Sequence, residues 1–276
     1  NKLLRCTVNP DLINGEAYKK QKVNKPCNVV VVGAGTAGLE AACTAAEVGC
    51  HVTLLEKQDH VGGLSVEISR IPAKKRLADF PAYLKHRAES LENLTIKTGV
   101  DVTVDMIRSY SPDLVVNATG SVPLLPPIEG LHENLGKEDT GVHGIKDLMD
   151  DIPAFDKDMT GKKVIVIGGG AVGLDVVEFF APRGAETTII EMMPVIGKGL
   201  DASTTSSMKE CMKKHSVTQL VNTALLKVNP HSFTVKRDGQ EEELPFDYGF
   251  VCLGMKAHAP LWNDIVEGFE GEDTEI

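Results

Sequence analysis

Two glycine-rich stretches of six residues are the parts of this sequence best suited to chemistry, because glycine lets the main chain approach a phosphate group closely. They are Gly33-Ala34-Gly35-Thr36-Ala37-Gly38 and Gly168-Gly169-Gly170-Ala171-Val172-Gly173. In such a turn the first glycine permits a tight bend, the second leaves room for a pyrophosphate, and the third lets a helix pack on a strand. Each stretch follows a β-branched run and precedes an apolar run of helical length. We therefore predict two dinucleotide-binding turns, with the phosphates at the start of the following helix.

An acidic residue follows each turn at the end of the next β-branched run, Glu56 in the first case and Glu191 in the second. Both stand 23 residues after the first glycine of their turn (residues 33 to 56 and 168 to 191). A carboxylate in this place accepts hydrogen bonds from the hydroxyl groups of an adenosine ribose. It also repels a 2′-phosphate, and Met192-Met193 offers no arginine to attract one. The second turn is therefore expected to prefer NAD(H) to NADP(H).

A strand-like segment that ends in glycine is a third landmark, and it recurs in step with the turn and the acid. Asp113–Gly120 (DLVVNATG) resembles Asp247–Gly254 (DYGFVCLG), and their last glycines stand 87 and 86 residues after the first glycine of each turn. Three landmarks in register indicate two copies of one nucleotide-binding unit. Gly120 and Gly254 are therefore expected to border the nucleotides as well.

Short β-branched runs and apolar helical runs must position these landmarks. The predicted buried parallel strands are residues 28–32, 51–55, 163–167 and 187–190, and the helices between them are residues 39–48 and 174–182. In the second copy three alternating segments indicate a small antiparallel meander, with Asp238-Gly239 as a hairpin turn: residues 219–228, 232–236 and 243–252. We predict an α/β protein with two Rossmann-like three-layer domains, each a parallel sheet with a small antiparallel meander.

The repeat also divides the chain into domains. The first 26 residues are polar, rich in lysine and without helical or strand periodicity, which predicts a linker arm. Residues 27–120 are predicted to form the first nucleotide-binding domain, which residues 256–276 complete, and residues 121–255 the second.

The composition excludes several other classes of protein. A hydrophobic fraction of 42% is that of a globular chain, and no apolar run reaches the roughly 18 residues of a membrane helix. The net charge of −10 argues against a nucleic-acid-binding module. The six cysteines lack paired spacing and no secretory signal is visible, so reduced thiols and a cytoplasmic location are expected. No catalytic triad and no histidine metal-ligand spacing is visible, so no catalytic residue is predicted.

The arrangement of the two turns resembles that of the flavoprotein reductases with two dinucleotide-binding domains, over residues 28–254. In that superfamily the first domain binds FAD, and the second, which is inserted into the first, binds NAD(P)H. Its disulfide reductases carry a pair of cysteines after the first acid or within the second domain. Lys57–Ser69 contains no cysteine and Cys211 stands alone in the second domain, so disulfide exchange is disfavoured.

The N-terminal stretch Arg5-Cys6-Thr7-Val8-Asn9-Pro10 is similar to a segment of the old yellow enzyme-type NADH:flavin oxidoreductases with an iron–sulfur cluster. These include 2-enoate reductase, 2,4-dienoyl-CoA reductase and trimethylamine dehydrogenase, and Gly62-Gly63-Leu64 also matches this group. The resemblance implies that Cys6 is the last ligand of a four-iron four-sulfur cluster and that an FMN-bearing barrel domain precedes residue 1. It also places Lys57, Gly63 and Leu64 among the cofactor-binding residues.

The resemblance implies the electron-input part of a bacterial NADH-dependent flavin oxidoreductase, homo-oligomeric when full length. Electrons would pass from NADH to FAD, then through the iron–sulfur cluster to FMN, and finally to an activated C=C bond. Two alternatives stay open: a module that holds ADP without turnover, and a stand-alone FAD-dependent disulfide or ferredoxin reductase. The family continues into a strand that ends in Gly-Asp, whereas Gly271-Glu272-Asp273 follows no predicted strand. The chain is therefore expected to be an excised fragment that lacks part of the flavin-facing half of its first site.

Overall fold

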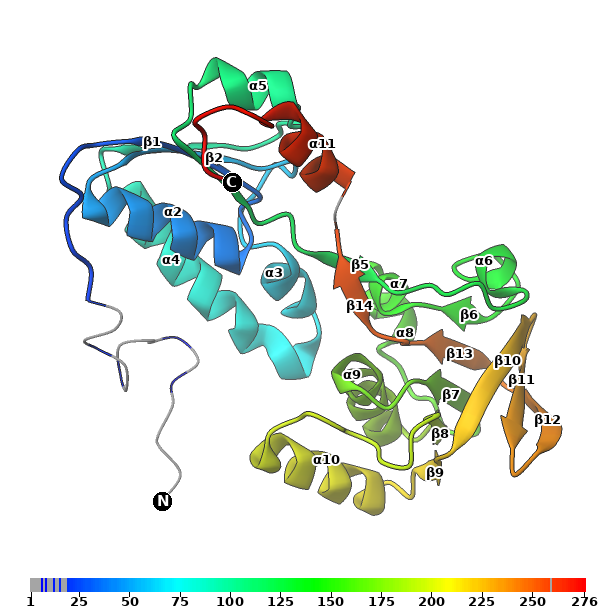
Figure 1. The fold of residues 1–276 in the computed structure, drawn as a ribbon. Coiled ribbons are helices and arrows are strands. Elements are labelled where there is room, and N and C mark those ends of the chain that lie inside the picture. Colours follow the sequence, from blue (N-terminus) through cyan, green and yellow to red (C-terminus); the bar gives the residue numbers. More distant parts are fainter. Residues whose placement is uncertain (1–5, 7, 9–11, 13–14, 16–18, 259) are drawn as a thin grey trace. The chain divides into compact units, whose positions relative to one another are not determined.

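The computed structural model describes residues 6, 8, 12, 15, 19–258 and 260–276, and the chain divides into two compact units (Figure 1). Unit 1 comprises Asn1–Ser121 and Ala257–Ile276, and unit 2 comprises Val122–Lys256. Both divisions lie one residue after the boundaries expected from the sequence. The chain passes between the units through β5 (Ser121–Pro123) and β14 (Met255–Ala257), which pair with each other as a two-stranded sheet.

Unit 1 is built on a four-stranded parallel sheet in the order β3-β2-β1-β4. Its strands are β1 (Asn28–Val32), β2 (His51–Leu55), β3 (Leu94–Lys97) and β4 (Leu114–Asn117). The four valines of β1 are all buried, since Val29 and Val31 face one apolar core and Val30 and Val32 face another. A strand buried on both faces explains the continuous β-branched run in the sequence.

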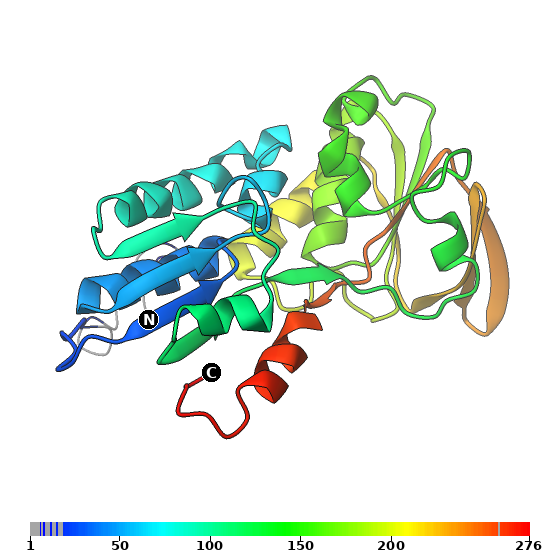
Figure 2. The same ribbon diagram turned by 90° about the horizontal axis from the view of Figure 1, so that it is seen from above.

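Helices cover both faces of this sheet. The core around Val29 and Val31 includes residues of α2 (Thr36–Val48) and α4 (Asp79–Glu89), and the connection between β2 and α4 holds α3 (Leu64–Ile68) and the 3₁₀ helix η1 (Pro72–Ala78). The other core contains residues of α5 (Val104–Ser109) and α11 (Pro260–Gly268), which lie together in Figure 2. The segment Ala257–Ile276, called the return segment below, thus completes unit 1.

Within the described part of unit 1, α5 stands where an antiparallel meander was expected. The segment 98–113 between β3 and β4 is short for three strands, and Thr103 begins a helix there because its hydroxyl accepts a hydrogen bond from Met106 N (3.3 Å). Arg108 of α5 then binds the Glu272 carboxylate (3.0 Å) and the Gly268 carbonyl of the return segment. The predicted class of two Rossmann-like α/β domains is confirmed, and the meander is found in unit 2.

Unit 2 repeats the parallel design with five strands in the order β6-β13-β7-β8-β9. These are β6 (Val142–His143), β13 (Tyr248–Val251), β7 (Lys163–Ile167), β8 (Glu186–Ile190) and β9 (Thr218–Leu220). Its helical segments are α6 (Leu131–Asn134), α7 (Ile145–Asp150), α8 (Ile152–Phe155), α9 (Ala171–Phe180), η2 (Ala181–Arg183) and α10 (Ala202–Lys214). No helix among the described residues is long and apolar enough to cross a membrane.

The antiparallel meander of unit 2 consists of β10 (Thr223–Asn229), β11 (Ser232–Arg237) and β12 (Gln240–Pro245). It shares an apolar core with the parallel sheet, in which the rings of Phe233 and Phe246 pack at a tilt of 45° with 4.5 Å between their centroids. The expected third segment, residues 243–252, is divided between β12 and the parallel strand β13. The division falls at Asp247, whose carboxylate accepts a hydrogen bond from Lys163 N of β7 (2.8 Å).

Candidate functional site: two nucleotide-binding turns

The first turn joins β1 to α2, and two of its three glycines are there because the main chain packs against itself. Gly33 has φ +97°, and a Cβ on it would collide with the Ala118 carbonyl that follows β4. A Cβ on Gly38 would collide with the carbonyl of Gly33. Any side chain at either position would push the strand, the helix and the end of β4 apart.

The middle glycine of the first turn borders open space. Gly35 has φ −69°, which any residue can adopt, and a Cβ on it would meet no atom within 4 Å. It is the N-cap of α2, and no side-chain hydrogen bond caps this helix. The first turn of α2, which contains Thr36 and Ala37, has no acidic residue. The N-terminal end of α2, with the positive end of the helix dipole, therefore faces a space that an anion can enter.

The second turn, between β7 and α9, repeats this geometry. Gly168 has φ +103°, and a Cβ on it would collide with the Cys252 carbonyl; a Cβ on Gly173 would collide with the Gly168 carbonyl. Gly170 has φ −79°, and a Cβ on it would meet no atom within 4 Å. It is the N-cap of α9, whose first residues are Ala171 and Val172, and no side-chain hydrogen bond caps this helix. Both helices thus begin inside the glycine motif, three residues earlier than the sequence predicts.

The two acidic residues are held in matching positions. In unit 1, Glu56 Oε2 accepts a hydrogen bond from Ala34 N (2.6 Å) and its Oε1 accepts one from Gln58 N (2.8 Å). In unit 2, Glu191 Oε2 accepts from Gly169 N (2.7 Å) and its Oε1 from Met193 N (2.8 Å). Each carboxylate therefore anchors the turn beside it. Each oxygen keeps lone-pair capacity for a hydroxyl donor such as a ribose hydroxyl.

A fourth landmark in register was missed by the sequence analysis. Gly62 N donates to the Ala34 carbonyl (2.8 Å), and Gly197 N donates to the Gly169 carbonyl (2.7 Å). Both glycines stand 29 residues after the first glycine of their turn (33 to 62 and 168 to 197) and have positive φ. In both copies the loop that follows the acid folds back onto the glycine turn. The equal spacing of Gly62 and Gly197 in the sequence was the signal that could have predicted this contact.

Beyond that hydrogen bond the two turns differ. Gly62 forms a β-bridge with Gly35, and a Cβ on Gly63 would lie 2.9 Å from Gly35 Cα. The hydroxyls of Thr36 and Ser65 are 2.9 Å apart, so α3, which begins at the exposed Leu64, is tied to the start of α2. In the second turn the residue one position after the folded-back glycine is Lys198, which is exposed, and Ala171 takes the place of Thr36. The first turn is therefore walled by a second segment of chain, and the second turn is more open.

Three other predicted site residues lie at the margins of these turns. Lys57 is exposed, and its ammonium group pairs with the Asp101 carboxylate at 3.2 Å. Gly120 and Gly254 have φ +79° and +108°, and a Cβ on either would meet no atom within 4 Å. Gly120 lies next to the return segment because its carbonyl accepts a hydrogen bond from His258 N (2.9 Å). Their roles in binding stay predictions.

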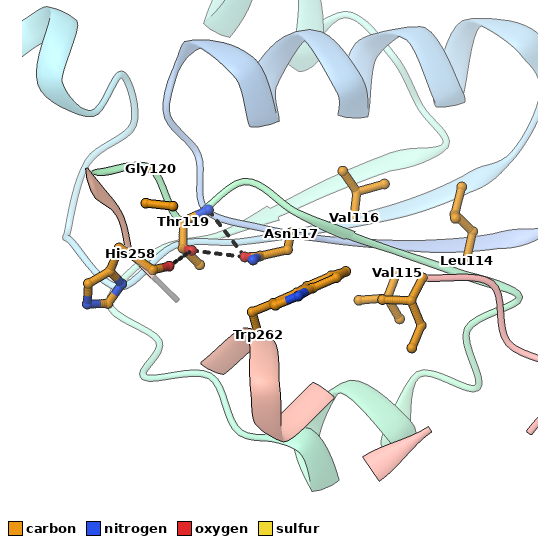
Figure 3. Close-up of a pocket in the computed structure, with 10 residues that line it drawn as sticks. Leu114, Val115, Val116, Asn117, Thr119, Gly120, His258 and Trp262 are labelled. Carbon is orange, nitrogen blue, oxygen red and sulfur yellow. Dashed lines mark hydrogen bonds between the residues drawn. The ribbon is translucent and has the colours of Figure 1, made fainter. Parts of the chain in front are cut away.

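A cavity of about 480 Å³ runs along β4 in unit 1 (Figure 3). The indole ring of Trp262, on α11, lies alongside β4 in this cavity, and the Thr119 hydroxyl donates to the His258 carbonyl at one end (2.8 Å). At the other end Glu275 pairs with Leu114 as a parallel β-bridge. Gly271 follows the helix α11 rather than a strand, as the sequence indicates.

Metal and thiol chemistry find little support near the turns. No group of three or more potential metal ligands occurs among the described residues, and Cys6 is exposed. Arg5, Thr7, Asn9 and Pro10 lie outside the described residues. Burial raises the pKa of the Cys252 thiol, next to the second turn, to about 12, with a further contribution from Asp175. That thiol is neutral at physiological pH, so it is not a nucleophile there.

Comparison with known protein families identifies the architecture. The family described as pyridine nucleotide-disulphide oxidoreductase matches residues 92–267, well over half of the chain. The chain belongs to this oxidoreductase family. A second family, the FAD-dependent oxidoreductases, matches residues 28–85, which include the first turn and Glu56. The two descriptions name the two classes of cofactor, pyridine nucleotide and FAD, that the two turns predict.

Individual relatives point to one branch of this family. The chain is 31% identical to an NADH oxidase of Thermoanaerobacter brockii over its whole length and 29% identical to a cinnamate reductase of Clostridium sporogenes over 94% of it. A solved structure of 2-naphthoyl-CoA reductase superimposes with a TM-score of 0.79 at 28% identity over 94% of the chain. The chain spans about two fifths of these proteins, at 41%, 37% and 38% of their lengths. The resemblance to the FAD- and NAD-binding part of the old yellow enzyme-type oxidoreductases is confirmed.

Proposed function

We propose that this chain binds FAD at the first turn and NADH at the second, as the electron-input part of a flavoprotein oxidoreductase. One observation carries the proposal: a single chain contains two glycine turns with the same open middle glycine and the same doubly anchored carboxylate. When bound, FAD supplies an electron carrier that accepts a hydride from NADH. The protein's part is to bind and orient the two nucleotides.

The difference between the turns supports the assignment of one nucleotide to each. In unit 1 the Gly62–Gly63 segment and the Thr36–Ser65 hydroxyl pair enclose the start of α2, which suits a nucleotide that stays bound. At the start of α9, Gly170 and Ala171 are exposed, whereas Gly35 and Thr36 are half-buried, which suits a nucleotide that enters and leaves with each turnover. Gly35 and Gly170 leave the space that a pyrophosphate needs in both.

Glu191 supports NADH as the second nucleotide. Its carboxylate is fixed by Gly169 N and Met193 N, so it cannot swing away from a 2′-phosphate without giving up two hydrogen bonds. Met192, the next residue, is 67% exposed and carries no charge to attract a phosphate. The same site therefore rejects NADP(H) by repulsion and accepts the free hydroxyls of NADH.

The proposal extends to a longer protein in which electrons continue through a four-iron four-sulfur cluster to FMN and reduce an activated C=C bond. The names of the cinnamate reductase and the 2-naphthoyl-CoA reductase support a reductase of unsaturated acids or thioesters. The described residues hold no ligand group for a cluster. In the proposed longer protein Cys6 would be one of several ligands of the cluster.

A second candidate function is a module that holds ADP at the first turn without turnover. The residues found at that site favour this function. Gly35, the Thr36–Ser65 pair and Glu56 are all placed to bind the adenosine and pyrophosphate, which ADP and FAD have in common. Calorimetric titration of the chain with FAD, ADP and NADH distinguishes the two. Tighter binding of FAD than of ADP, together with NADH binding, supports electron input; equal affinity for FAD and ADP without NADH binding supports the module.

Two matched variants assign each nucleotide to its turn. Gly35→Val puts a side chain into the open space at the start of α2, and we expect FAD binding to be lost while NADH binding is kept. Gly170→Val should do the reverse. Circular dichroism controls for folding, which neither substitution should disturb because both glycines have φ values that valine adopts. Loss of both nucleotides in a folded variant would contradict the assignment.

A further inference from the structure

Cys27 and Cys50 form a close pair of thiols in unit 1, and neither cysteine belongs to the two glycine turns. Their Sγ atoms are 3.0 Å apart. Cys27 immediately precedes β1 and Cys50 immediately precedes β2, and the next residues, Asn28 and His51, are direct partners in the parallel ladder. The two cysteines thus extend the register of neighbouring strands by one position, and their side chains meet on the same face of the sheet.

The main chain holds both cysteines in place. The Cys27 carbonyl accepts a hydrogen bond from His51 N (2.8 Å), and Cys50 N donates to the Ala45 carbonyl (3.0 Å). The Cys50 carbonyl accepts from the Asn93 amide (2.7 Å). Cys50 is 4% exposed, whereas Cys27 is half-buried and reachable by a small oxidant. The sulfurs need to approach by only about 1 Å to reach the roughly 2.05 Å of a disulfide bond.

We propose that Cys27 and Cys50 are an oxidisable dithiol that closes to a disulfide in the presence of a peroxide. Hydrogen peroxide oxidises the more exposed Cys27 thiol to a sulfenic acid and releases one water. The Cys50 sulfur then attacks the Cys27 sulfur, the S–S bond forms, and the hydroxyl leaves as a second water. Two S–H bonds and one O–O bond are broken, and the two electrons lost by the sulfurs reduce the peroxide.

The surroundings of Cys27 make this a slow reaction at neutral pH. Its hydrogen bond with Cys50 and its partial burial raise the pKa of the Cys27 thiol to about 11. Because the thiolate is the nucleophile, little reactive sulfur is present near pH 7, and the fraction rises with alkalinity. The pair therefore responds to sustained exposure to peroxide rather than to a brief pulse.

The disulfide would strengthen unit 1 without touching the first turn. It joins residues 23 positions apart, and the loop that it closes contains β1, the glycine turn and α2. A cross-link of this kind lowers the entropy of the unfolded chain. Because the pair precedes β1 and β2 whereas Gly33 and Glu56 follow them, the oxidised form should keep its nucleotide affinity.

The test is treatment of the chain with hydrogen peroxide at pH 7 and pH 9, followed by peptide mass mapping. We expect the peptides of Cys27 and Cys50 to be joined and lighter by two hydrogens, faster at pH 9, with a higher midpoint of thermal unfolding that dithiothreitol reverses. Cys27→Ser and Cys50→Ser should each abolish both effects, while the matched Cys43→Ser, a buried thiol of the same unit, keeps them. Separate peptides, with other cysteines oxidised, would overturn the proposal. So would a joined pair with an unchanged midpoint.

Discussion

Glu56 and Glu191 each combine two roles in one side chain. Their carboxylates hold the glycine turns through main-chain N–H groups and present the remaining lone pairs to a ligand. A hydrogen bond to a charged group contributes about 1.5–3 kcal/mol, against about 1 kcal/mol for a neutral one. The charge therefore stabilises the turn, and in the proposed function it would also bind the ribose and repel a 2′-phosphate.

Removing that charge gives the first prediction. Glu191→Gln keeps an oxygen that accepts from Gly169 N but loses the negative charge. We expect the dissociation constant for NADH to rise by about tenfold, as a loss of about 1.4 kcal/mol requires, and the preference for NADH over NADPH to shrink. Calorimetric titration with both nucleotides measures this. Glu56→Gln is the matched control and should leave NADH affinity unchanged; an unaltered preference in Glu191→Gln would contradict the role.

At the scale of elements, α2 and α4 are joined by a cluster around Arg87, whose side chain is 15% exposed. Its guanidinium binds the Glu47 carboxylate twice, including Nη2 to Oε2 at 2.8 Å, and the Glu40 carboxylate at 2.7 Å. Lys20 also binds Glu47, so the residues just before β1 are tied to the end of α2. The cluster fixes the helix whose other end forms the first nucleotide-binding turn.

The second prediction concerns this cluster. Arg87→Ala should lower the free energy of unfolding of unit 1 by about 1–3 kcal/mol, because it leaves two carboxylates close together without the cation that bridges them, and only Lys20 remains beside Glu47. Arg87, with a smaller contribution from Lys20, lowers the pKa of Glu47 from 4.5 to about 2. This contribution is present above pH 4.5 and is lost as the pH falls towards 2. Urea unfolding of both proteins at pH 7 and pH 3 should show a smaller difference at pH 3; an equal difference would contradict this account.

The third prediction concerns His143 on β6 in unit 2. Its ring lies 5.2 Å from Phe155 and 5.4 Å from Phe250, and burial lowers its pKa below the ordinary 6.5. Because burial disfavours the protonated ring in the folded protein, this contribution to stability is fully present above pH 6.5. It falls as the pH drops below 6.5, since the unfolded chain then takes up a proton more readily than the folded protein. Urea unfolding from pH 8 to pH 5 should show this loss. His143→Phe should flatten the profile, and a wild-type profile in that variant would rule out His143 as the cause.

The sequence predicts best what the main chain alone decides. The glycine turns follow from steric limits at Gly33, Gly38, Gly168 and Gly173, and the buried strands follow from their β-branched runs. The replacement of a meander by α5, and the fold of the return segment as α11, depend on packing between segments about 160 residues apart, such as Arg108 with Glu272. Contacts between residues so far apart in the chain cannot be predicted from local sequence patterns. The Thr36–Ser65 pair was missed for the same reason.

At the scale of the whole molecule, the chain is two copies of one design that have diverged at the loop after the acid. Unit 1 has the walled turn and is completed by the return segment, and unit 2 has the open turn and the meander. Because each turn is complete within its own unit, we expect the two nucleotides to bind independently. The fourth prediction is that saturation with FAD changes the dissociation constant for NAD⁺, which cannot reduce the flavin, by less than about threefold in calorimetric titration. A change of tenfold or more would reveal coupling.

Electron transfer from the second nucleotide to the first is the central claim, and an anaerobic absorbance measurement tests it directly. The chain is loaded with FAD, freed of excess flavin and mixed with NADH under nitrogen. The account predicts loss of the flavin absorbance with NADH, little loss with NADPH, and none in the matched Gly170→Val variant loaded with the same amount of FAD. Oxidised flavin that persists with bound NADH in the unsubstituted chain would contradict it.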